Sequence, residues 1–421
     1  MSALARRLYR KIYKLRPIVG YVLLPYNALE YILLLLLHTR DLRRTEAVYP
    51  MRFGAFGHQA SEPHLLAMRF KGKKLLILLS DYRNFNRYIL ESFHGVVDIR
   101  WLKHAWLGRF CYNRNFGTRE IRAMQTWVLP RFLRCIGSNA RIVPEFCERR
   151  DEQVTGSYIN QHIDLLESDA NIDVPVLSAP IERFRDLLHA RFPEAQGRFC
   201  VGLYLRKKFA SSYDIRDTDP TPYRAVIDHI FSKGGFVLCG GDYDPHVLYP
   251  GCPGIYGYND FSCGRALCDY YFLTQPAFVI GGHSGPTPVA AVFRTPYLVT
   301  NNAFFYLSGY HATDMVLWKK LQERSTGRIL QAQETFTFPI VALIENEPFV
   351  QRGLVHIDNT AEELVAAVDE MIARHVEGKA FNVHGEYKVL LDRFRALLPA
   401  NAVAVRSPCT PCLSYLKNLL W

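Results

Sequence analysis

The chain has 421 residues, enough for two α/β domains of ordinary size, and its 49% apolar and 22% charged residues are typical of a globular protein. The formal net charge of +11 is concentrated at the N-terminus, where residues 1–16 contain only basic charges. Nucleic-acid-binding proteins usually carry a basic stripe through the fold. The distribution therefore excludes nucleic acid as the expected partner and favours anionic lipid headgroups.

The ten cysteines form no disulfide framework, which fits a reducing cytoplasm. Cys409 and Cys412 make a C-x-x-C pair, but neither a second pair nor a nearby histidine completes a zinc site. We interpret this pair as incidental.

Residues 17–38 form an apolar run of nearly the length that spans a bilayer. Pro25, Asn27 and Glu30 interrupt it, and arginines flank both ends. Positive charge on both sides favours a segment that lies in the cytoplasmic leaflet over one that crosses it. We therefore predict that residues 1–45 are a membrane-associating segment, with the protein peripheral or monotopic on the inner membrane. The alternative is an ordinary buried helix docked on the first domain.

Residues 46–178 are predicted to be an α/β domain on the acceptor side. Residues 51–66 resemble a first strand and a glycine turn that contains His58. Buried strands over 74–79 and 96–99 alternate with a helix over 86–93, which favours a parallel sheet. A polar, proline-containing stretch over 168–178 is the expected linker.

Residues 179–360 are predicted to be a second α/β domain. A strand over 199–205 runs into Arg206, and a helix over 221–231 leads to a strand over 236–239. Gly240, Gly241 and Asp242 end that strand. Residues 361–421 are expected to be helical, because Thr360 and Glu363 form a capping box before an apolar helical pattern.

The region 277–302 reads as strand, tight glycine turn, short helix and strand. Such a turn aims the N–H groups at the start of the helix toward the carboxyl edge of a parallel sheet, where α/β folds bind phosphates. Ser284 is the expected N-cap and Pro286 the first helical residue. Ser284, Gly285 and Thr287 would supply the N–H groups. The alternative is a turn that needs glycine for geometry alone.

Arg206 should lie at the same sheet edge as this turn, where its guanidinium can bind a phosphate with two hydrogen bonds. The alternative interpretation is a solvated basic turn, because Lys207 and Lys208 follow directly.

From Met51 onward the chain resembles a bacterial family of surface-polysaccharide glycosyltransferases with the two-domain GT-B fold. The arginine that follows a strand also resembles that of protein O-fucosyltransferase donor domains. The resemblance rests on short motifs in order, namely Phe56-Gly57-His58, Leu203-Tyr204-Leu205-Arg206, Asp214-Ile215-Arg216-Asp217, Gly240-Gly241-Asp242, Gly282-His283-Ser284-Gly285, Trp318-Lys319-Lys320-Leu321 and Asp358-Asn359-Thr360.

The resemblance implies two Rossmann-like domains that face each other across a cleft holding a nucleotide-sugar. His58 and Arg206 are the expected catalytic residues, His58 as acceptor base. The predicted donor-binding residues are Arg206, Arg216, Gly240, Asp242, His283, Ser284, Gly285, Thr287, Asn301 and Asn302.

Asp242 and Asp244 form a D-x-D sequence, which chelates a divalent cation in metal-dependent glycosyltransferases. GT-B enzymes generally use arginine, lysine and a helix N-terminus instead. We expect no metal and no cofactor, with the nucleotide-sugar as donor substrate.

The predicted function is transfer of a sugar to a glycan or lipid-linked acceptor held at the cytoplasmic membrane leaflet. Two alternatives remain open. A nucleotide-sugar epimerase of the same architecture would act without an acceptor, and a non-catalytic membrane-associated binding protein would bind no nucleotide.

Overall fold

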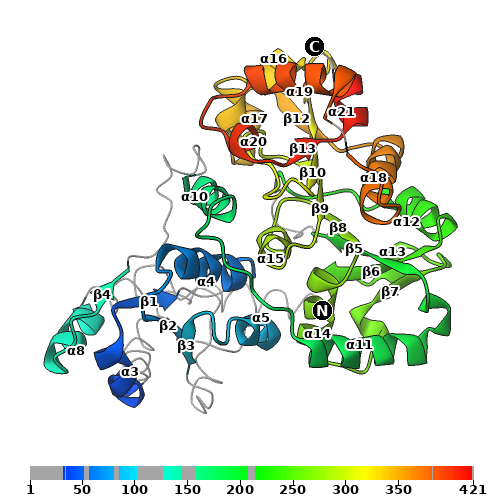
Figure 1. Cartoon of the computed structure of the whole chain (residues 1–421). Coiled ribbons are helices and arrows are strands. Elements are labelled where there is room, and N and C mark those ends of the chain that lie inside the picture. Colours follow the sequence, from blue (N-terminus) through cyan, green and yellow to red (C-terminus); the bar gives the residue numbers. More distant parts are fainter. Residues whose placement is uncertain are drawn as a thin grey trace, which may run out of the picture. The chain divides into compact units, whose positions relative to one another are not determined.

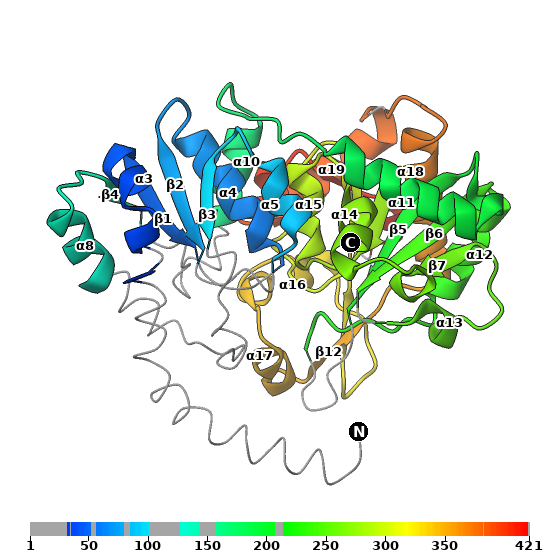
Figure 2. The same ribbon diagram turned by 90° about the horizontal axis from the view of Figure 1, so that it is seen from below.

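The computed structural model describes residues 32–33, 35–51, 56–79, 85–101, 127–143, 157–206, 214–241, 243–381 and 383–419. The chain forms two units, and each contains a parallel β-sheet (Figures 1 and 2). Met1–Ala55, Arg69–Phe85 and Phe93–Phe146 make up unit 1, and Phe56–Met68, Asn86–Ser92 and Cys147–Trp421 make up unit 2. The mixed α/β class with parallel sheets is as predicted.

Unit 1 has a four-stranded sheet of order β3-β2-β1-β4, in which every neighbouring pair is parallel. The strands and packed helices are β1 (Ala47–Met51), β2 (Leu75–Leu79), β3 (Asp98–Trp101), β4 (Arg141–Ile142), α3 (Thr39–Arg44) and α8 (Leu129–Cys135). Pro130 lies in the first turn of α8, where no N–H is needed for a hydrogen bond within the helix.

The N-terminal segment is partly built into unit 1. Leu35 and Leu42 are fully buried and pack in one apolar cluster with Val48 of β1 and Leu133 of α8. Within the residues that the structure describes, no helix is both long and apolar enough to cross a membrane. Most of the predicted apolar run, residues 17–31, lies outside those residues. The part after position 34 therefore belongs to the fold of unit 1.

Unit 2 is built on a seven-stranded, all-parallel sheet of order β13-β10-β9-β8-β5-β6-β7. Its strands are β5 (Phe199–Leu205), β6 (Gly235–Gly241), β7 (Ile255–Gly257), β8 (Phe278–Gly281), β9 (Tyr297–Asn302), β10 (Met315–Trp318) and β13 (Thr410–Pro411). A separate antiparallel pair joins β11 (Lys320–Glu323) to β12 (Leu354–Ile357). Strand β12 thus lies outside the main sheet.

Helices cover both faces of this sheet. In Figure 1, α11 (Ser178–Arg191) and α14 (Arg265–Thr274) lie together on one side, and α12 (Tyr223–Ser232) and α18 (Ala361–His375) lie on the other. The remaining helices are α4 (His58–Arg69), α5 (Arg87–Ser92), α10 (Ser157–Leu166), α13 (Pro245–Leu248), α15 (Pro286–Val292), α16 (Ala332–Thr335), α17 (Asn346–Gln351), α19 (Gly385–Leu397), α20 (Val403–Arg406), α21 (Leu413–Asn418) and the 3-10 turns Pro193–Ala195, Tyr258–Asp260 and Ile340–Ala342.

The boundaries of the units differ from those expected from the sequence. Helix α4 belongs with unit 2, where the His64 ring lies 3.1 Å from His162 Nε2 and 2.7 Å from the carbonyl oxygen of Ile172. The C-terminal helices are also part of unit 2, because β13 extends its sheet and the predicted Thr360–Glu363 capping box opens α18. The expected first strand lies earlier, at β1, and the expected turn is present at Phe56 and Gly57, but α4 begins at His58, so residues 58–66 are helical.

The strand order creates a switch point in the sheet. The chain runs outward from β5 to β6 and β7, then returns to place β8 on the opposite side of β5. The carboxyl ends of the two strands on either side of a switch point diverge and leave a crevice, where open α/β sheets bind ligands. Arg206 follows β5 and His283 follows β8, so both lie at this point.

Candidate functional site

The Phe56–His58 turn packs directly on the turn after β8. A Cβ atom on Gly57 would lie 2.5 Å from Pro288 Cγ and 2.9 Å from the Gly285 carbonyl oxygen. Only glycine fits such a close approach of two backbones. Two motifs that are far apart in the sequence, and that we had selected independently, therefore form one structure at the carboxyl edge of the sheet.

The turn after β8 agrees with the sequence prediction at Pro286 but not at Ser284. Pro286 is the first residue of α15, as predicted, but Gly285 occupies the N-cap position and no side chain caps the helix. The prediction of Ser284 as N-cap was therefore wrong. The Ser284 N–H donates to Thr287 Oγ1 (3.2 Å), and the Thr287 N–H donates to the Ser284 carbonyl oxygen (3.1 Å). Two of the three N–H groups expected to bind phosphate are thus engaged within the turn.

His283 and Ser284 instead present polar side-chain atoms. His283 Nε2 and Ser284 Oγ are buried and have no hydrogen-bond partner among the described residues. Burial, followed by the charge of Arg216, lowers the pKa of His283 to about 4. The imidazole is therefore neutral at pH 7, and both side chains can bond to a ligand.

Arg206 and Arg216 converge on one carboxylate. Asp214 Oδ2 lies 2.8 Å from Arg206 Nη2 and 2.6 Å from Arg216 Nη2, and Arg216 Nε donates to Asp214 Oδ1 at 2.9 Å. Burial alone would raise the pKa of Asp214, but the hydrogen bonds from Arg216 and the two positive charges lower it to about 2. The cluster keeps a net positive charge, and each guanidinium has five N–H donors, more than Asp214 uses.

His58, the predicted acceptor base, is paired with a buried carboxylate. Its Nδ1 lies 2.6 Å from Glu62 Oε1, one helical turn along α4. The Glu62 side chain is 2% exposed, whereas that of His58 is 47% exposed. A carboxylate that accepts from Nδ1 fixes the tautomer with its lone pair on Nε2, which is the arrangement that a general base needs.

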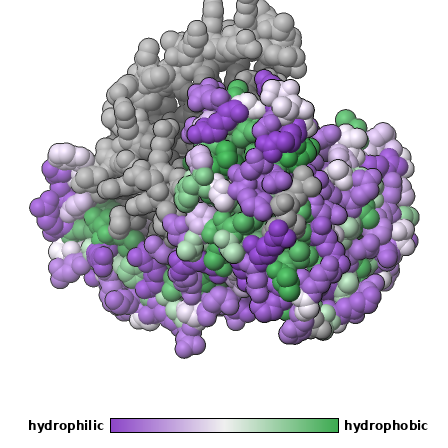
Figure 3. Space-filling view, turned by 90° about the horizontal axis from the view of Figure 1, so that it is seen from above, coloured by the Kyte–Doolittle hydropathy of each residue, from purple (hydrophilic) through white to green (hydrophobic). Residues whose placement is uncertain are grey.

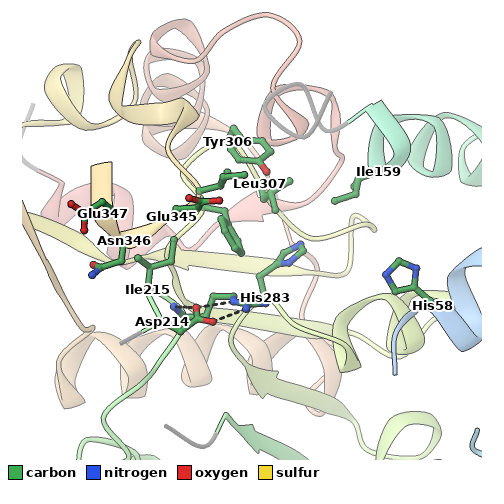
Figure 4. Close-up of a pocket in the computed structure, with 13 residues that line it drawn as sticks. His58, Ile159, Asp214, Ile215, His283, Tyr306, Leu307, Glu345, Asn346 and Glu347 are labelled. Atoms are coloured by element: carbon green, nitrogen blue, oxygen red, sulfur yellow. Dashed lines mark hydrogen bonds and ion pairs between the residues drawn. The ribbon is translucent and has the colours of Figure 1, made fainter. Parts of the chain in front are cut away.

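His58, Asp214, Arg216 and His283 line one cavity of about 750 Å³ within unit 2. This volume is in the range of small-molecule sites. Glu62 and Arg206 contact these residues but are not part of the lining, and neither is Ser284. Figure 4 shows His58 at one side of the cavity, His283 in the middle and the Glu345–Glu347 segment at the opposite side. The lining residues are His58, Ile159, Asp214, Ile215, Arg216, His283, Phe304, Tyr306, Leu307, Ile344, Glu345, Asn346 and Glu347.

Asn301 and Asn302 do not line this cavity. Both are buried, and Asn301 exchanges two hydrogen bonds with Asn359, at 2.8 Å and 2.6 Å. Asn302 donates to the Leu307 carbonyl oxygen and accepts from the Phe304 N–H. Asn301 also has a φ of 49°, a left-handed conformation that asparagine tolerates better than most residues. Their contacts explain them as structural residues, and nothing in the cavity requires them as sugar ligands.

Lys319 and Asp358, which belong to two of the sequence motifs, hold the turn that lines the cavity in place. Lys319 is 1% exposed, and its ammonium group lies 2.8 Å from Asp358 Oδ1 and donates to the Asp217 carbonyl oxygen at 2.6 Å. Asp217 in turn accepts from the Asp214 N–H (3.1 Å). The buried lysine therefore anchors the turn that carries Asp214 and Arg216.

The remaining predicted ligands are not part of the cavity lining. Gly240 lies in β6, where a Cβ atom would lie 2.9 Å from the Phe272 ring. Asp242 lies outside the described residues. Asp244 is the N-cap of α13 and accepts from the His246 N–H at 3.0 Å. Within the described part of the chain, no group of three His, Cys, Asp or Glu residues is placed to hold a metal ion.

Two residues of the site were not predicted from the sequence, namely Glu62, which pairs with His58, and Phe304, which lines the cavity. Glu62 precedes Pro63 in a stretch that was expected to be strand and turn. Its spacing of four residues from His58 therefore did not predict that the two side chains meet on one face of a helix. Phe304, whose ring lies 6.0 Å from the Arg216 guanidinium and 6.1 Å from the His283 ring, follows Asn302 in a coil that has no sequence signature.

No protein-family model matches the chain, and no curated protein sequence matches it. Among solved structures, the chain is similar to a glycosyl transferase family 9 protein from Veillonella parvula, at 11% identity and a TM-score of 0.47 over 79% of this chain and 98% of that one. It is also similar to Escherichia coli heptosyltransferase WaaC with ADP, at 12% identity and a TM-score of 0.39 over 79% and 98%.

A UDP-N-acetylglucosamine 2-epimerase is similar at 10% identity and a TM-score of 0.37 over 82% of this chain and 100% of the epimerase. At TM-scores below 0.5 these similarities assign neither a fold family nor an activity to the chain. None of the three is a protein fucosyltransferase, and that resemblance stays a prediction. The function has to be argued from the cavity itself.

Proposed function

We propose that the protein is a glycosyltransferase that moves a sugar from a nucleotide-sugar to an acceptor hydroxyl. The observation that carries the proposal is that His58, which is paired with Glu62, lines the same cavity as Arg216, which shares Asp214 with Arg206. Glycosyl transfer to a hydroxyl group needs a base for the acceptor and positive charge for the leaving diphosphate. The cavity holds both.

In the proposed reaction, His58 Nε2 takes the proton of the acceptor hydroxyl as its oxygen bonds to the anomeric carbon of the donor. The bond from that carbon to the diphosphate breaks, and the electron pair leaves with the diphosphate oxygen. Arg216, with Arg206 beside it on Asp214, stabilises the developing charge. The neutral His283 ring and the Ser284 hydroxyl supply further polar contacts to the donor.

The proposed reaction uses no metal and no cofactor, because two guanidinium groups carry out the charge stabilisation that a divalent cation supplies elsewhere. Activity should therefore survive EDTA. Its loss on chelation and return on addition of Mg²⁺ or Mn²⁺ would contradict metal independence. The acceptor in this proposal is a glycan or lipid-linked molecule at the cytoplasmic face of the inner membrane, which agrees with the basic, apolar N-terminus.

A panel of nucleotides and nucleotide-sugars in a thermal-shift assay tests the binding part of the proposal. A ligand at a hundred times its dissociation constant stabilises a protein by roughly 2.7 kcal/mol. If no nucleotide raises the melting temperature, the cavity does not bind a donor and a non-catalytic role is favoured. If a nucleotide-sugar binds and is epimerised without any acceptor, the epimerase alternative is correct.

The His58–Glu62 pair tests the chemical part. Glu62→Gln keeps the shape of the side chain but removes the negative charge that fixes the tautomer of His58 and stabilises its protonated form, so kcat should fall while KM for the donor stays near the wild-type value. His58→Gln should lower kcat more, by about 10²–10⁴-fold. If both variants have the same kcat and the same KM for the donor as the wild type, His58 is not the base and only shapes its turn.

A further inference from the structure

An apolar row faces solvent on unit 1. Ile32, Leu33, Leu36 and Leu37 are 36%, 48%, 56% and 62% exposed, whereas Leu35 is fully buried. Ile32 and Leu36, and likewise Leu33 and Leu37, are four residues apart in a helical stretch, so each pair shares a face. The helical stretch therefore turns one apolar side to the core and a second apolar side outward, which is unusual for a surface helix of a soluble protein.

Helix α8 packs beside this stretch. Arg43 Nε donates to the Ile136 carbonyl oxygen (2.8 Å), and Ser138 Oγ donates to the Leu42 carbonyl oxygen (2.7 Å). Just before α8 lies Trp127, which is 61% exposed. Its ring lies 4.8 Å from the guanidinium of Arg131. Tryptophan beside arginine is the pair that proteins place at a membrane–water interface, because the indole is apolar with one polar edge.

The charges around this row are mostly positive. Exposed arginines are present on both helices, namely Arg40, Arg43, Arg44, Arg131 and Arg134. Of the acidic residues nearby, Asp41 is bonded to Arg100 and His38, and Glu46 is exposed next to β1. Figure 3 shows an apolar area at the left of the molecule that is bordered by strongly polar residues.

We propose that this apolar–basic face, made of Ile32, Leu33, Leu36, Leu37 and Trp127 with the five arginines, docks unit 1 onto an anionic lipid bilayer. The leucines and Ile32 enter the boundary between headgroups and acyl chains, Trp127 lies at headgroup level, and the arginines bind lipid phosphates. A second copy of the chain fits less well, because a two-fold contact would bring the same arginines of both copies together.

The proposal differs from the prediction for residues 1–45, because it places lipid contacts on the folded surface of unit 1 and adds α8 to them. It does not depend on the proposed reaction. A protein with this face would bind membranes whether the cavity in unit 2 transfers sugars or not.

The test is co-sedimentation of the full chain with vesicles of phosphatidylcholine alone and of equal parts phosphatidylcholine and phosphatidylglycerol. The wild type should bind the anionic vesicles at least about tenfold more tightly, since each arginine near the surface contributes roughly fivefold. Arg131→Glu/Arg134→Glu and Leu36→Glu/Leu37→Glu should each weaken binding at least about tenfold. Trp127→Ala should have a smaller effect.

Val247→Glu/Val389→Glu is the matched control. Both valines are more exposed than the leucines, at 78% and 67%, but they lie in unit 2, so vesicle binding should not change. Nucleotide thermal shifts should be the same in every variant, which separates this proposal from the proposed reaction. If Leu36→Glu/Leu37→Glu does not fold, vesicle binding by the Arg131→Glu/Arg134→Glu variant, which changes α8 instead, tests the proposal.

Two results would overturn the proposal. In one, both double variants of the face bind anionic vesicles as tightly as the wild type. In the other, the wild type is a dimer by sedimentation velocity, and the variants lose the dimer instead of vesicle binding. The second result would assign the face to a second copy of the chain.

Discussion

The carboxyl edge of the unit 2 sheet has two regions with similar residues and opposite character. At the ends of β5 and β8, Arg206 and His283 lie beside a cavity of about 750 Å³. At the ends of β9 and β10, Asn301, Asn302 and Lys319 are equally polar but are buried and paired with other protein groups. Polar residues after parallel strands mark the edge of the sheet, but only unfilled space beside them marks a ligand site.

The difference follows from topology. The β5–β8 pair is the switch point, so the connecting segments diverge and leave a crevice. At β9 and β10 the chain returns through β12, and Asp358 and Asn359 fill the corresponding space. We call the ends of β5 and β8 the open edge and the ends of β9 and β10 the closed edge. The predictions below give different expected effects for residues at the two edges.

The largest expected effect is on stability at the closed edge. Lys319→Met removes the charged partner of Asp358, which keeps the hydrogen bond from the Asp219 N–H, and it also removes the donor to the Asp217 carbonyl oxygen. Removing one partner of a buried ion pair costs about 3 kcal/mol or more, and the 21% exposure of Asp358 places this change near the lower end of that cost. Urea denaturation should show this loss. Because Lys319 holds the turn that carries Arg216 but does not line the cavity, nucleotide affinity should fall less than in Arg216→Ala. A variant of normal stability that no longer binds nucleotide would move Lys319 into the site.

A smaller effect is expected from pH. The pKa of His283 is lowered from 6.5 to about 4, so the unfolded chain binds more protons than the folded one between these values. Its contribution to stability is fully present above pH 6.5 and is lost as pH falls toward 4, with a slope of about 1 kcal/mol per pH unit. His283→Asn should flatten the dependence of the unfolding free energy on pH in this window.

The same dependence can distinguish the two edges. Burial, followed by the charge of Lys319, lowers the pKa of His356 to about 3, and this histidine lies at the closed edge. A bound diphosphate should favour the protonated form of His283 and so reduce the contribution of His283 to the pH dependence of the unfolding free energy. The contribution of His356 should stay unchanged. If saturating nucleotide has no effect on the pH dependence, the diphosphate does not lie beside His283.

The sequence predicted the strands of the open edge well. β5 has the predicted bounds, Phe199–Leu205, and the predicted order of strand, glycine turn, short helix and strand over 277–302 is present as β8, α15 and β9, because runs of apolar residues define such strands strongly. It also placed Arg206 and the turn after β8 at one edge, since the ends of adjacent parallel strands lie together.

Other features depend on tertiary contacts that no local pattern shows. Gln59, Ser61, Glu62 and His64 are polar residues buried in α4, so this helix has no polar face and its periodicity is hidden. The burial of Asn301 depends on Asn359, which arrives from a distant segment. Asp214 was visible in a motif, but its position between two arginines required the folded turn.

One expectation about Arg206 has to be revised. From the sequence, its side chain was expected to have no partner in the empty protein, with a salt bridge to Asp214 or Asp217 as the competing interpretation. In the first case Arg206→Ala would hardly change the melting temperature, and in the second it would lower stability. The structure pairs it with Asp214 at 2.8 Å. Because both side chains are partly exposed, the loss of this pair should lower stability only modestly.

The most direct test of the central claim is the affinity for nucleoside diphosphates, measured by isothermal titration with ADP, UDP, GDP and CDP. Charged hydrogen bonds are worth about 1.5–3 kcal/mol each, so Arg206→Ala and Arg216→Ala should each weaken the best ligand at least about tenfold, and Arg206→Lys less. Arg224→Ala removes a comparable arginine–aspartate pair, to Asp228, away from the cavity and should bind normally. The account is contradicted if the wild type binds none of the four, or if Arg206→Ala and Arg216→Ala are destabilised but bind nucleotide as the wild type does.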